Sequence, residues 1–271
     1  MKKFFAILLT GVLTLGLAAC GGSEDTAEDA ITLKIGATPT PHAEILTAAK
    51  EELAAQGITL EIVEFTDYVQ PNLATDSGDL DANFFQHTPY LDTFNADHGT
   101  ELVSAGTVHY EPMGIFGGTA KALADIPEGG KIGIPNDGTN GGRALLLLEA
   151  NGLIKLNPEA GISATKLDIV ENPLNLEIID MDAAQLPLSL GDLSAAVING
   201  NFAMQNGLNV ADALAIEAAD SLAAETYGNI VAVKAGNEEL PGIAELMQVL
   251  QSEAIAEFIA NTYGGAVVST K

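Results

Sequence analysis

The pattern that most restricts the fold is a strand, a helix and a second strand in direct succession near the start of the chain. Ile31–Ile35 is apolar at alternate positions, which predicts a β-strand. Thr40 and Pro41 suit the N-cap and first position of a helix, which then carries an apolar face and ends at Gly57. A further strand is predicted over Thr59–Phe65. Two strands joined through a helix lie parallel in one sheet with a right-handed crossover. Ligands of such sheets bind beyond the carboxyl ends of the strands.

The same pattern continues and then begins again in the middle of the chain. A third strand is predicted over Leu80–Phe85, with helices on either side of it. The long extended run Leu102–Phe116, interrupted by Pro112, is interpreted as a crossover into a second lobe. Lys131-Ile132-Gly133 then echoes Lys34-Ile35-Gly36, since each triplet lies on a strand that leads through a loop into a helix. We therefore expect two lobes of similar construction.

The second lobe contains a glycine-rich stretch that favours an anion. A strand at Lys131–Ile134 leads through a loop of Asn, Asp, Gly and Thr into a helix predicted over Arg143–Asn151. Free backbone N–H groups at a helix N-terminus attract an anion. A cation in the first turn, as predicted for Arg143, is slightly unfavourable beside the helix dipole. A bound carboxylate would offset that cost and match the guanidinium fork. The alternative is an ordinary strand-to-helix turn with a solvated arginine.

The remaining elements complete the two lobes. We predict strands at Leu167–Val170, Leu176–Ile179 and Ala195–Ile198, a helical segment at Ala183–Leu190, an extended return crossover at Asn229–Val233, and two amphipathic helices at Gly242–Leu250 and Ser252–Tyr263 that pack back on the first lobe. Lobe 1 is accordingly expected to comprise residues 31–115 and 232–271, and lobe 2 residues 116–231.

The first 20 residues are typical of a lipoprotein export signal and are set apart from the fold. Two lysines precede an apolar run that is short for a membrane span, and Leu17-Ala18-Ala19-Cys20 has the form of a lipobox. We expect a signal peptide over residues 1–19, a lipid on Cys20, and a flexible acidic tether over residues 20–30. The alternative is an ordinary secretory signal. Cys20 is the only cysteine, so the chain has no thiol for a disulfide, a Cys-ligated metal or a cysteine nucleophile.

The composition limits the classes of partner. With 47% hydrophobic and 18% charged residues among 271, the chain is globular and not disordered. Its formal net charge of −26 argues against nucleic acid or anionic lipid as a partner. The charge describes the surface and identifies no substrate.

Seven side chains fall at predicted strand ends or crossovers, and together they suit a zwitterion with an apolar tail. A guanidinium can hold a carboxylate, amide oxygens accept from an ammonium, and aromatic rings contact an apolar side chain or a thioether sulfur. Taken singly, a phenylalanine is usually part of the core and an asparagine after a strand is usually part of a turn. The prediction rests on the convergence of all seven, which are Tyr68, Phe85, His87, Arg143, Asn199, Asn201 and Asn229.

Eight segments carry a more specific signal: Pro41–Leu46, Asp67–Asn72, Leu80–His87, Glu111–Ile115, Ile134–Asp137, Asn140–Leu145, Ala183–Pro187 and Ala196–Asn201. Together they resemble the methionine-binding lipoproteins of ABC importers, the NlpA-type family of substrate-binding proteins. The resemblance implies an α/β, two-lobe, periplasmic-binding-protein-like fold of type II. In that fold each lobe is a mainly parallel sheet flanked by helices, and the ligand lies in the hinged cleft.

The resemblance also implies roles for the seven side chains. Tyr68 and Phe85 match the aromatic clamp around the thioether, and Arg143 matches the carboxylate ligand. Contacts to the backbone of the amino acid are implied for His87, Asn201 and Asn229, and Asn199 lies in a matching motif.

The partners that follow from the resemblance are L-methionine or a close analogue and a membrane-embedded ABC importer permease. The protein is then held by its N-terminal lipid, a palmitate, on the extracytoplasmic face of the cell membrane. The resemblance implies binding without catalysis, and neither a cofactor nor a metal.

Three alternatives remain open from the sequence. The ligand could be another small apolar amino acid or a short methionine peptide, because an apolar pocket discriminates by only about 1–3 kcal/mol per methylene. An enzyme is disfavoured because the chain has no Gly-x-Ser-x-Gly elbow, no His-Glu-x-x-His motif and no cysteine nucleophile. A metal-binding receptor would use the four histidines, but no two have helical ligand spacing; these are His42, His87, His98 and His109.

Overall fold

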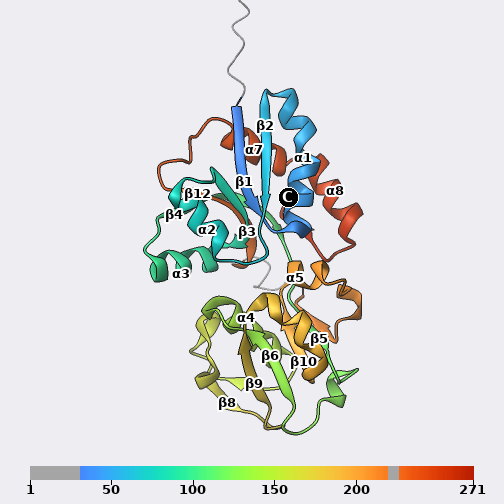
Figure 1. The fold of residues 1–271 in the computed structure, drawn as a ribbon. Coiled ribbons are helices and arrows are strands. Elements are labelled where there is room, and N and C mark those ends of the chain that lie inside the picture. The colour runs from blue at the N-terminus through green and yellow to red at the C-terminus, as the bar shows by residue number, and fades with distance from the viewer. Residues whose placement is uncertain (1–30, 219–225) are drawn as a thin grey trace, which may run out of the picture.

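The computed structural model describes residues 31–218 and 226–271, which fold into two lobes, one above the other in Figure 1. The predicted signal peptide, the lipid-bearing Cys20 and the tether lie outside these residues. Among the described residues, no helix combines the length and the apolar character that crossing a membrane requires.

Lobe 1 is built on a six-stranded sheet with the strand order β13-β4-β12-β3-β1-β2. A short helical turn at Pro39–Ala43 precedes α1. The strands are β1 (Ile31–Ala37), β2 (Ile58–Glu64), β3 (Ala82–His87), β4 (Leu102–Tyr110), β12 (Gly228–Lys234) and β13 (Val268–Ser269), and the helices are α1 (Glu44–Ala55), α2 (Gln70–Ser77), α3 (Thr88–His98), α7 (Ile243–Leu250) and α8 (Glu253–Tyr263).

Lobe 2 is built on a five-stranded sheet with the strand order β11-β5-β10-β6-β9, and a two-stranded sheet joins β7 to β8. Its strands are β5 (Gly114–Gly117), β6 (Lys131–Pro135), β7 (Lys155–Leu156), β8 (Ile169–Glu171), β9 (Glu177–Met181), β10 (Ala195–Ile198) and β11 (Ala215–Ile216), and its α-helices are α4 (Gly138–Ala150) and α5 (Gly200–Gln205). Short 3-10 helices fill the connections at Leu123–Asp125, Gly161–Ser163, Lys166–Asp168, Ala183–Gln185, Pro187–Asp192 and Val210–Asp212.

The opening strand–helix–strand unit is confirmed, because β1 pairs in parallel with β2 and also with β3. The expectation that each sheet is mainly parallel is wrong. In lobe 1, β12 runs antiparallel to both β3 and β4, and in lobe 2, β5 runs antiparallel to β10 and β11. The physical reason is that β5 and β12 arrive from the other lobe, so neither is fed by a crossover helix that would force a parallel direction.

Two segments carry the chain between the lobes. The first joins β4, which ends at Tyr110, to β5, which begins at Gly114. The second joins β11, which ends at Ile216, to β12, which begins at Gly228. The prediction of the return crossover at Asn229–Val233 is wrong, because these residues pair with β3 and β4 inside the lobe 1 sheet. The domain boundaries expected at 115/116 and 231/232 fall inside β5 and β12, each of which belongs whole to one sheet.

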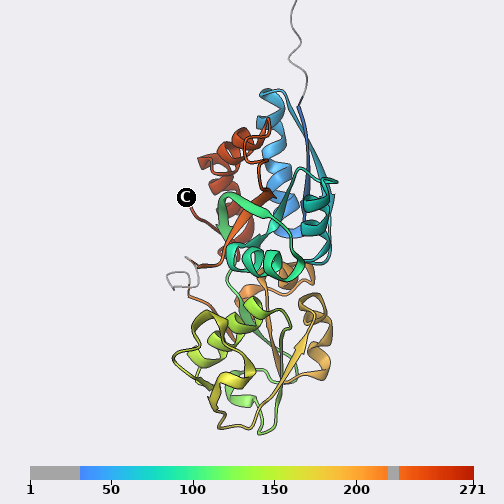
Figure 2. The same ribbon diagram turned by 90° about the vertical axis from the view of Figure 1, so that its left-hand side faces the viewer.

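The core of lobe 1 lies between its sheet and three helices. Figure 2 shows α1, α7 and α8 gathered on one side of the upper sheet. The apolar face predicted for α1 is buried in this core, as Ile45, Leu46, Ala49 and Leu53. Residues of α7 and α8 join the same core, so the two C-terminal helices pack on lobe 1 as predicted. Each fully buried Leu or Ile contributes roughly 1.5–3 kcal/mol to that packing.

The helix α4 begins five residues earlier than predicted, at Gly138 and not at Arg143. The glycines suggested a loop, but they are needed for close packing inside the helix. A Cβ on Gly142 would lie 2.6 Å from the carbonyl oxygen of Ile162, and one on Gly141 would lie 2.9 Å from that of Pro135. Arg143 therefore lies in the second turn of α4. It is beyond the first turn, where the helix dipole would disfavour a cation.

Of two other predicted elements, one agrees with the structure and one differs from it. Ala183–Leu190 is helical as predicted, in the form of two short 3-10 helices, the second of which begins at Pro187. The strand predicted from Leu167 begins at Ile169, because Lys166–Asp168 forms a 3-10 turn with a capping box between Thr165 and Asp168. Local capping there overrides the apolar pattern.

Candidate ligand-binding site

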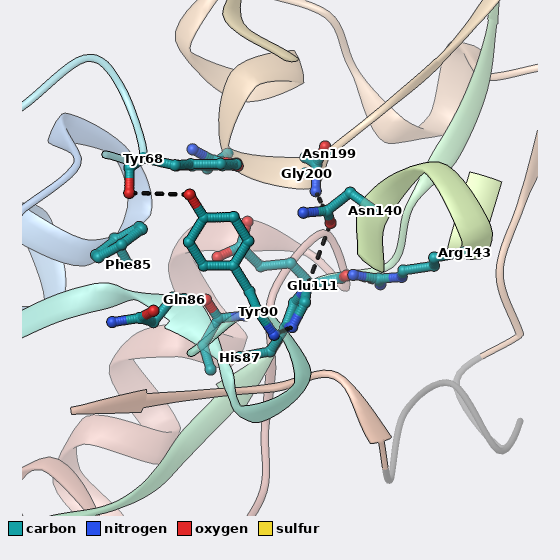
Figure 3. A pocket seen from close by; sticks show the side chains of 12 residues that line it. Tyr68, Phe85, Gln86, His87, Tyr90, Glu111, Asn140, Arg143, Asn199 and Gly200 are labelled. Carbon is teal, nitrogen blue, oxygen red and sulfur yellow. Dashed lines mark hydrogen bonds between the residues drawn. The ribbon is translucent and has the colours of Figure 1, made fainter. Parts of the chain in front are cut away.

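A buried polar pocket lies between the two lobes, and all seven side chains predicted from the sequence line it. The cavity that these walls enclose is small, about 20 Å³. Figure 3 draws the lining side chains and labels most of them. The complete lining is Tyr68, Phe85, Gln86, His87, Tyr90, Glu111, Asn140, Arg143, Asn199, Gly200, Asn201 and Asn229.

Sequence reasoning missed five of these residues: Gln86, Tyr90, Glu111, Asn140 and Gly200. A signal existed for four of them, because Gln86, Glu111, Asn140 and Gly200 lie within segments that were singled out, whereas Tyr90 lies three residues after the end of one. The sequence could not show which residues of those segments face inward.

One end of the pocket is aromatic. The rings of Tyr68 and Phe85 have centroids 5.5 Å apart, and Tyr68 also packs on Phe202 at 4.8 Å. A side chain held between two rings needs them about 7 Å apart, since each carbon contact takes about 3.5 Å. In this structure Tyr68 and Phe85 therefore touch and form one apolar wall, without an open slot between them. The Tyr90 hydroxyl fixes this wall by donating to the carbonyl oxygen of Tyr68 at 3.1 Å.

Asn140 connects the two lobes through its side-chain amide. Its nitrogen donates to the carboxylate of Asp137, and its oxygen accepts from the amide nitrogen of Asn199 at 2.7 Å. The same oxygen lies 3.2 Å from Nε2 of His87, as the dashed lines in Figure 3 show. Because Nδ1 of His87 accepts from the backbone N–H of Tyr90, Nε2 carries the proton and donates to Asn140. Burial, and then the charge of Arg143, lower the pKa of His87 to about 3, so its ring is neutral at neutral pH.

A second chain of hydrogen bonds orients Asn229. The amide oxygen of Asn229 lies 3.0 Å from Nε2 of His42. An amide oxygen can only accept, so Nε2 carries the proton and the neutral ring accepts at Nδ1 from the Thr38 hydroxyl, 2.6 Å away. Burial lowers the pKa of His42 to about 4, in keeping with that neutral form. The amide nitrogen of Asn229 remains as the donor that the residue can offer to the pocket.

Two amide atoms in the pocket lining are buried without a hydrogen-bond partner among the described residues: Oδ1 of Asn199 and Nδ2 of Asn201. Asn199 is 7% exposed and Asn201 is 3% exposed. The other half of each amide is occupied, since Asn199 donates to Asn140, and Asn201 accepts from the Tyr68 hydroxyl at 2.6 Å. A buried polar atom without a partner costs about 1–3 kcal/mol. The pocket therefore holds one acceptor and one donor that a ligand could satisfy.

Arg143 lines the pocket, but its fork is already engaged. Nε donates to Oε1 of Glu217 at 2.8 Å and Nη2 donates to Oε2 at 2.5 Å. Nη2 also donates to the backbone oxygen of Glu111, and the guanidinium lies 4.4 Å from the ring centre of Tyr227. The bidentate partner expected to be a ligand carboxylate is thus Glu217 in this structure. Glu217 lies 74 residues further along the chain, where no local pattern could link it to Arg143.

The N-terminus of α4 is also occupied. Asp137 caps the helix by accepting from the backbone N–H of Asn140 at 2.8 Å and from the Thr139 hydroxyl at 2.9 Å. The anion expected at this helix end is therefore the carboxylate of Asp137, which belongs to the chain itself. The backbone at the start of α4 is not left free for a ligand, and only side chains of this helix line the pocket.

Glu111 lies on the first crossing segment and contacts both lobes. Its Oε1 lies 2.8 Å from Nε2 of His109 and 3.3 Å from Nε2 of His42. On the lobe 2 side, the backbone N–H of Asn201 bonds to the Glu111 carboxyl. Burial raises the pKa of Glu111 above its usual value.

The four histidines do not form one metal site. His42 and His109 come together with Glu111, and their ligand atoms lie within 4.8 Å of one another. His87 bonds instead to Asn140, and His98 stacks on Phe94 with ring centroids 4.0 Å apart.

Two α/β lobes joined by two crossing segments, with a buried polar pocket between them, define a two-lobe substrate-binding protein. The chain belongs to the NlpA lipoprotein family, whose profile matches residues 33–270.

Characterised relatives match almost the whole chain. It is 40% identical over 277 residues to the methionine-binding lipoprotein MetQ of Bacillus subtilis, covering 99% of this chain and 98% of that one. It is 38% identical over 270 residues to the D-methionine-binding lipoprotein MetQ of Salmonella typhimurium, covering 98% and 97%.

Solved structures confirm the α/β fold of this class. A lipoprotein from Ruminococcus gnavus shares 52% identity with a TM-score of 0.87, over 89% of this chain and 99% of that one. A nutrient-binding protein from Burkholderia cenocepacia, bound to methionine, shares 42% identity with a TM-score of 0.83, over 88% and 100%.

Proposed function

We propose that this protein captures methionine outside the cytoplasmic membrane and delivers it to an ABC importer. The observation that carries the proposal is that one buried pocket combines an aromatic wall with amide groups that have no hydrogen-bond partner among the described residues. A free amino acid with an apolar side chain offers the matching combination of an apolar part and charged polar groups. The relatives named for methionine binding, and the related structure bound to methionine, support this choice of ligand.

The polar groups suggest how the amino acid would lie. The donors that would serve the carboxylate are Nδ2 of Asn201, Nδ2 of Asn229 and the guanidinium nitrogen of Arg143 that does not bond to Glu217. Oδ1 of Asn199 would accept from the ammonium. The side chain would lie against Tyr68 and Phe85, where a thioether gains contact with ring edges. The ligand is bound and released unchanged in this proposal, with His87 and Asn140 holding the amide groups in place.

The lipid anchor belongs to the same proposal. The lipobox at Leu17–Cys20 and the acidic segment after it would hold the lobes at the extracytoplasmic face, beside the importer permease. Membership of a lipoprotein family supports this arrangement.

Isothermal titration calorimetry on protein freed of pre-bound ligand by unfolding and refolding tests the proposal. We expect saturable binding of methionine, and mass spectrometry should recover it unchanged. Phe85→Ala removes part of the apolar wall without removing a side-chain hydrogen bond. It should weaken methionine binding roughly tenfold to a hundredfold, since burying such a side chain is worth about 1.5–3 kcal/mol. The free amino acid alanine, used as a second ligand, is too short to reach the wall. Its affinity should therefore change much less in this variant.

Phe94→Ala is the matched control. Phe94 is equally buried and packs on Tyr90 in the same aromatic cluster, but it does not line the pocket. It should lower stability while leaving the preference for methionine over alanine intact. Failure of the wild-type protein to bind methionine, or an equal preference loss in both variants, would refute the proposal.

A further inference from the structure

The pocket contains one carboxylate that has no cationic partner. Among the lining residues, Arg143 is the one with a permanent positive charge and Glu111 the one with an acidic side chain. The charge of Arg143 is already matched by Glu217 in a bidentate ion pair. The groups closest to Oε1 of Glu111 are the imidazoles of His42 and His109. Burial lowers their pKa values to about 4 and about 3, so at neutral pH they supply hydrogen bonds and no charge.

The geometry leaves part of this carboxylate facing the pocket. The two histidines approach Oε1 from lobe 1. Oε2 lies on the other side, toward Gly200, where it is 3.0 Å from the place a Cβ would occupy. Gly200 lines the pocket, and any side chain there would displace or cover the carboxylate. The backbone N–H of Asn201 also bonds to this carboxyl, and the missing side chain at Gly200 leaves room beside it for a further donor from a small ligand.

A buried carboxylate without a counter-charge is costly, and a carboxylate–ammonium hydrogen bond is about twice as strong as a neutral one. The unpartnered Oδ1 of Asn199, next in sequence to Gly200, offers a second acceptor for the same group. We propose that Glu111 is the counter-charge for the ammonium group of the ligand and makes the pocket selective for ligands with a free ammonium. This inference rests on the proposed function, and it names the chemical class of ligand that the site accepts.

A divalent cation is the competing occupant. His42, His109 and Glu111 present three ligand atoms within 4.8 Å. The hydrogen bond from His42 Nε2 to Asn229 and that from Thr38 to His42 Nδ1 account for the His42 ring without a metal. Glu111 also lines the ligand pocket, whereas neither histidine does. The ammonium is therefore favoured.

The test compares two ligands that differ only in the ammonium, methionine and 4-(methylthio)butanoate. Calorimetry on the wild-type protein should show at least tenfold tighter binding of methionine. Glu111→Gln keeps the shape and one acceptor oxygen but removes the charge. This variant should lower the ratio of the two affinities at least tenfold, mainly because its affinity for methionine is weaker. Glu111→Asp, which keeps the charge, should retain more of the ratio than the glutamine variant.

Each outcome decides one point. Wild-type protein that binds neither ligand refutes the proposed function, and this inference with it. Wild-type protein that binds both equally well refutes the inference alone, even if Glu111→Gln fails to fold. A glutamine variant that weakens both ligands by the same factor assigns Glu111 a structural role. Stabilisation of the wild-type protein by zinc chloride, lost in Glu111→Gln while the affinity ratio stays constant, would assign the cluster to a metal.

Discussion

Arg143 shows how the role of a single residue depends on a partner far away in sequence. In its bidentate pair with Glu217 the side chains are 4% and 7% exposed. Glu217 also accepts from the Tyr110 hydroxyl at 2.6 Å and from the backbone N–H of Met113 at 2.8 Å. The pair thus ties α4 to both crossing segments. Loss of affinity after removing Arg143 would combine a lost ligand contact with a disturbed hinge.

A double-mutant cycle separates these effects. Arg143→Met and Glu217→Gln should each lower the free energy of unfolding by roughly 3–5 kcal/mol. The first leaves the buried carboxylate of Glu217 without a cation, and the second leaves the buried guanidinium of Arg143 without an anion. The double variant should lose much less than the sum, because it leaves neither buried charge without its partner. Urea denaturation measures all four species.

The exposed pair between Lys155 and Glu171 provides the control for this cycle, because its side chains are 59% and 62% exposed. Lys155→Met should change stability little, since solvent already screens that pair. If the buried pair behaved like the exposed one, or if its two single losses simply added, the coupling would be absent.

At the scale of elements, α4 carries Asn140 and Arg143 into the pocket from a helix that begins with Gly138. Its cap, Asp137, also holds the amide of Asn140 through two 3.0 Å contacts. One carboxylate therefore both starts the helix and sets the orientation of a pocket side chain.

Asp137→Ala should lower the free energy of unfolding by about 1 kcal/mol through loss of the cap. It should also weaken methionine binding roughly tenfold, because the Asn140 amide loses the contact that orients its oxygen toward His87 and Asn199. Ser252→Ala is the matched control, since Ser252 caps α8 by accepting from the backbone N–H of Ile255 at 3.3 Å, away from the pocket. Denaturant melts measure the stability of both variants, and calorimetry measures their affinity for methionine. Equal affinity in the two variants would contradict the role of Asp137 in the pocket.

At the scale of the whole molecule, the lobes meet around the pocket through named side chains. Tyr68 of lobe 1 bonds to Asn201 of lobe 2, and His87 of lobe 1 bonds to Asn140 of lobe 2. Gln205 of lobe 2 also donates to the carbonyl oxygen of Thr40 in lobe 1 at 3.2 Å. Glu111 adds a contact from the crossing segment itself. The ligand proposed here would be enclosed by both lobes, and the tether from Cys20 would keep that assembly near the membrane.

Cys20→Ala tests the anchor. The apolar signal is unchanged in this variant, but the thiol that would carry the lipid is absent, so the protein should leave the membrane fraction. Ser23→Ala, in the same segment, should remain membrane-bound. Fractionation with immunodetection measures the distribution, and an alanine variant at Cys20 that stays in the membrane like the wild type would contradict the anchor.

The sequence by itself determined the opening strand–helix–strand unit, the first crossing and the seven side chains that line the pocket, whereas it placed the return crossing at Asn229–Val233, which lies within β12. These follow from local periodicity and from the fact that carboxyl ends of neighbouring parallel strands meet at one edge. Only the tertiary structure decided that Glu217 takes the fork of Arg143, that Glu111 stands between two neutral histidines, and that the glycines of α4 serve packing and not a loop. The physical reason is that hydrogen-bond partners and desolvation depend on groups distant in sequence, which no local pattern records.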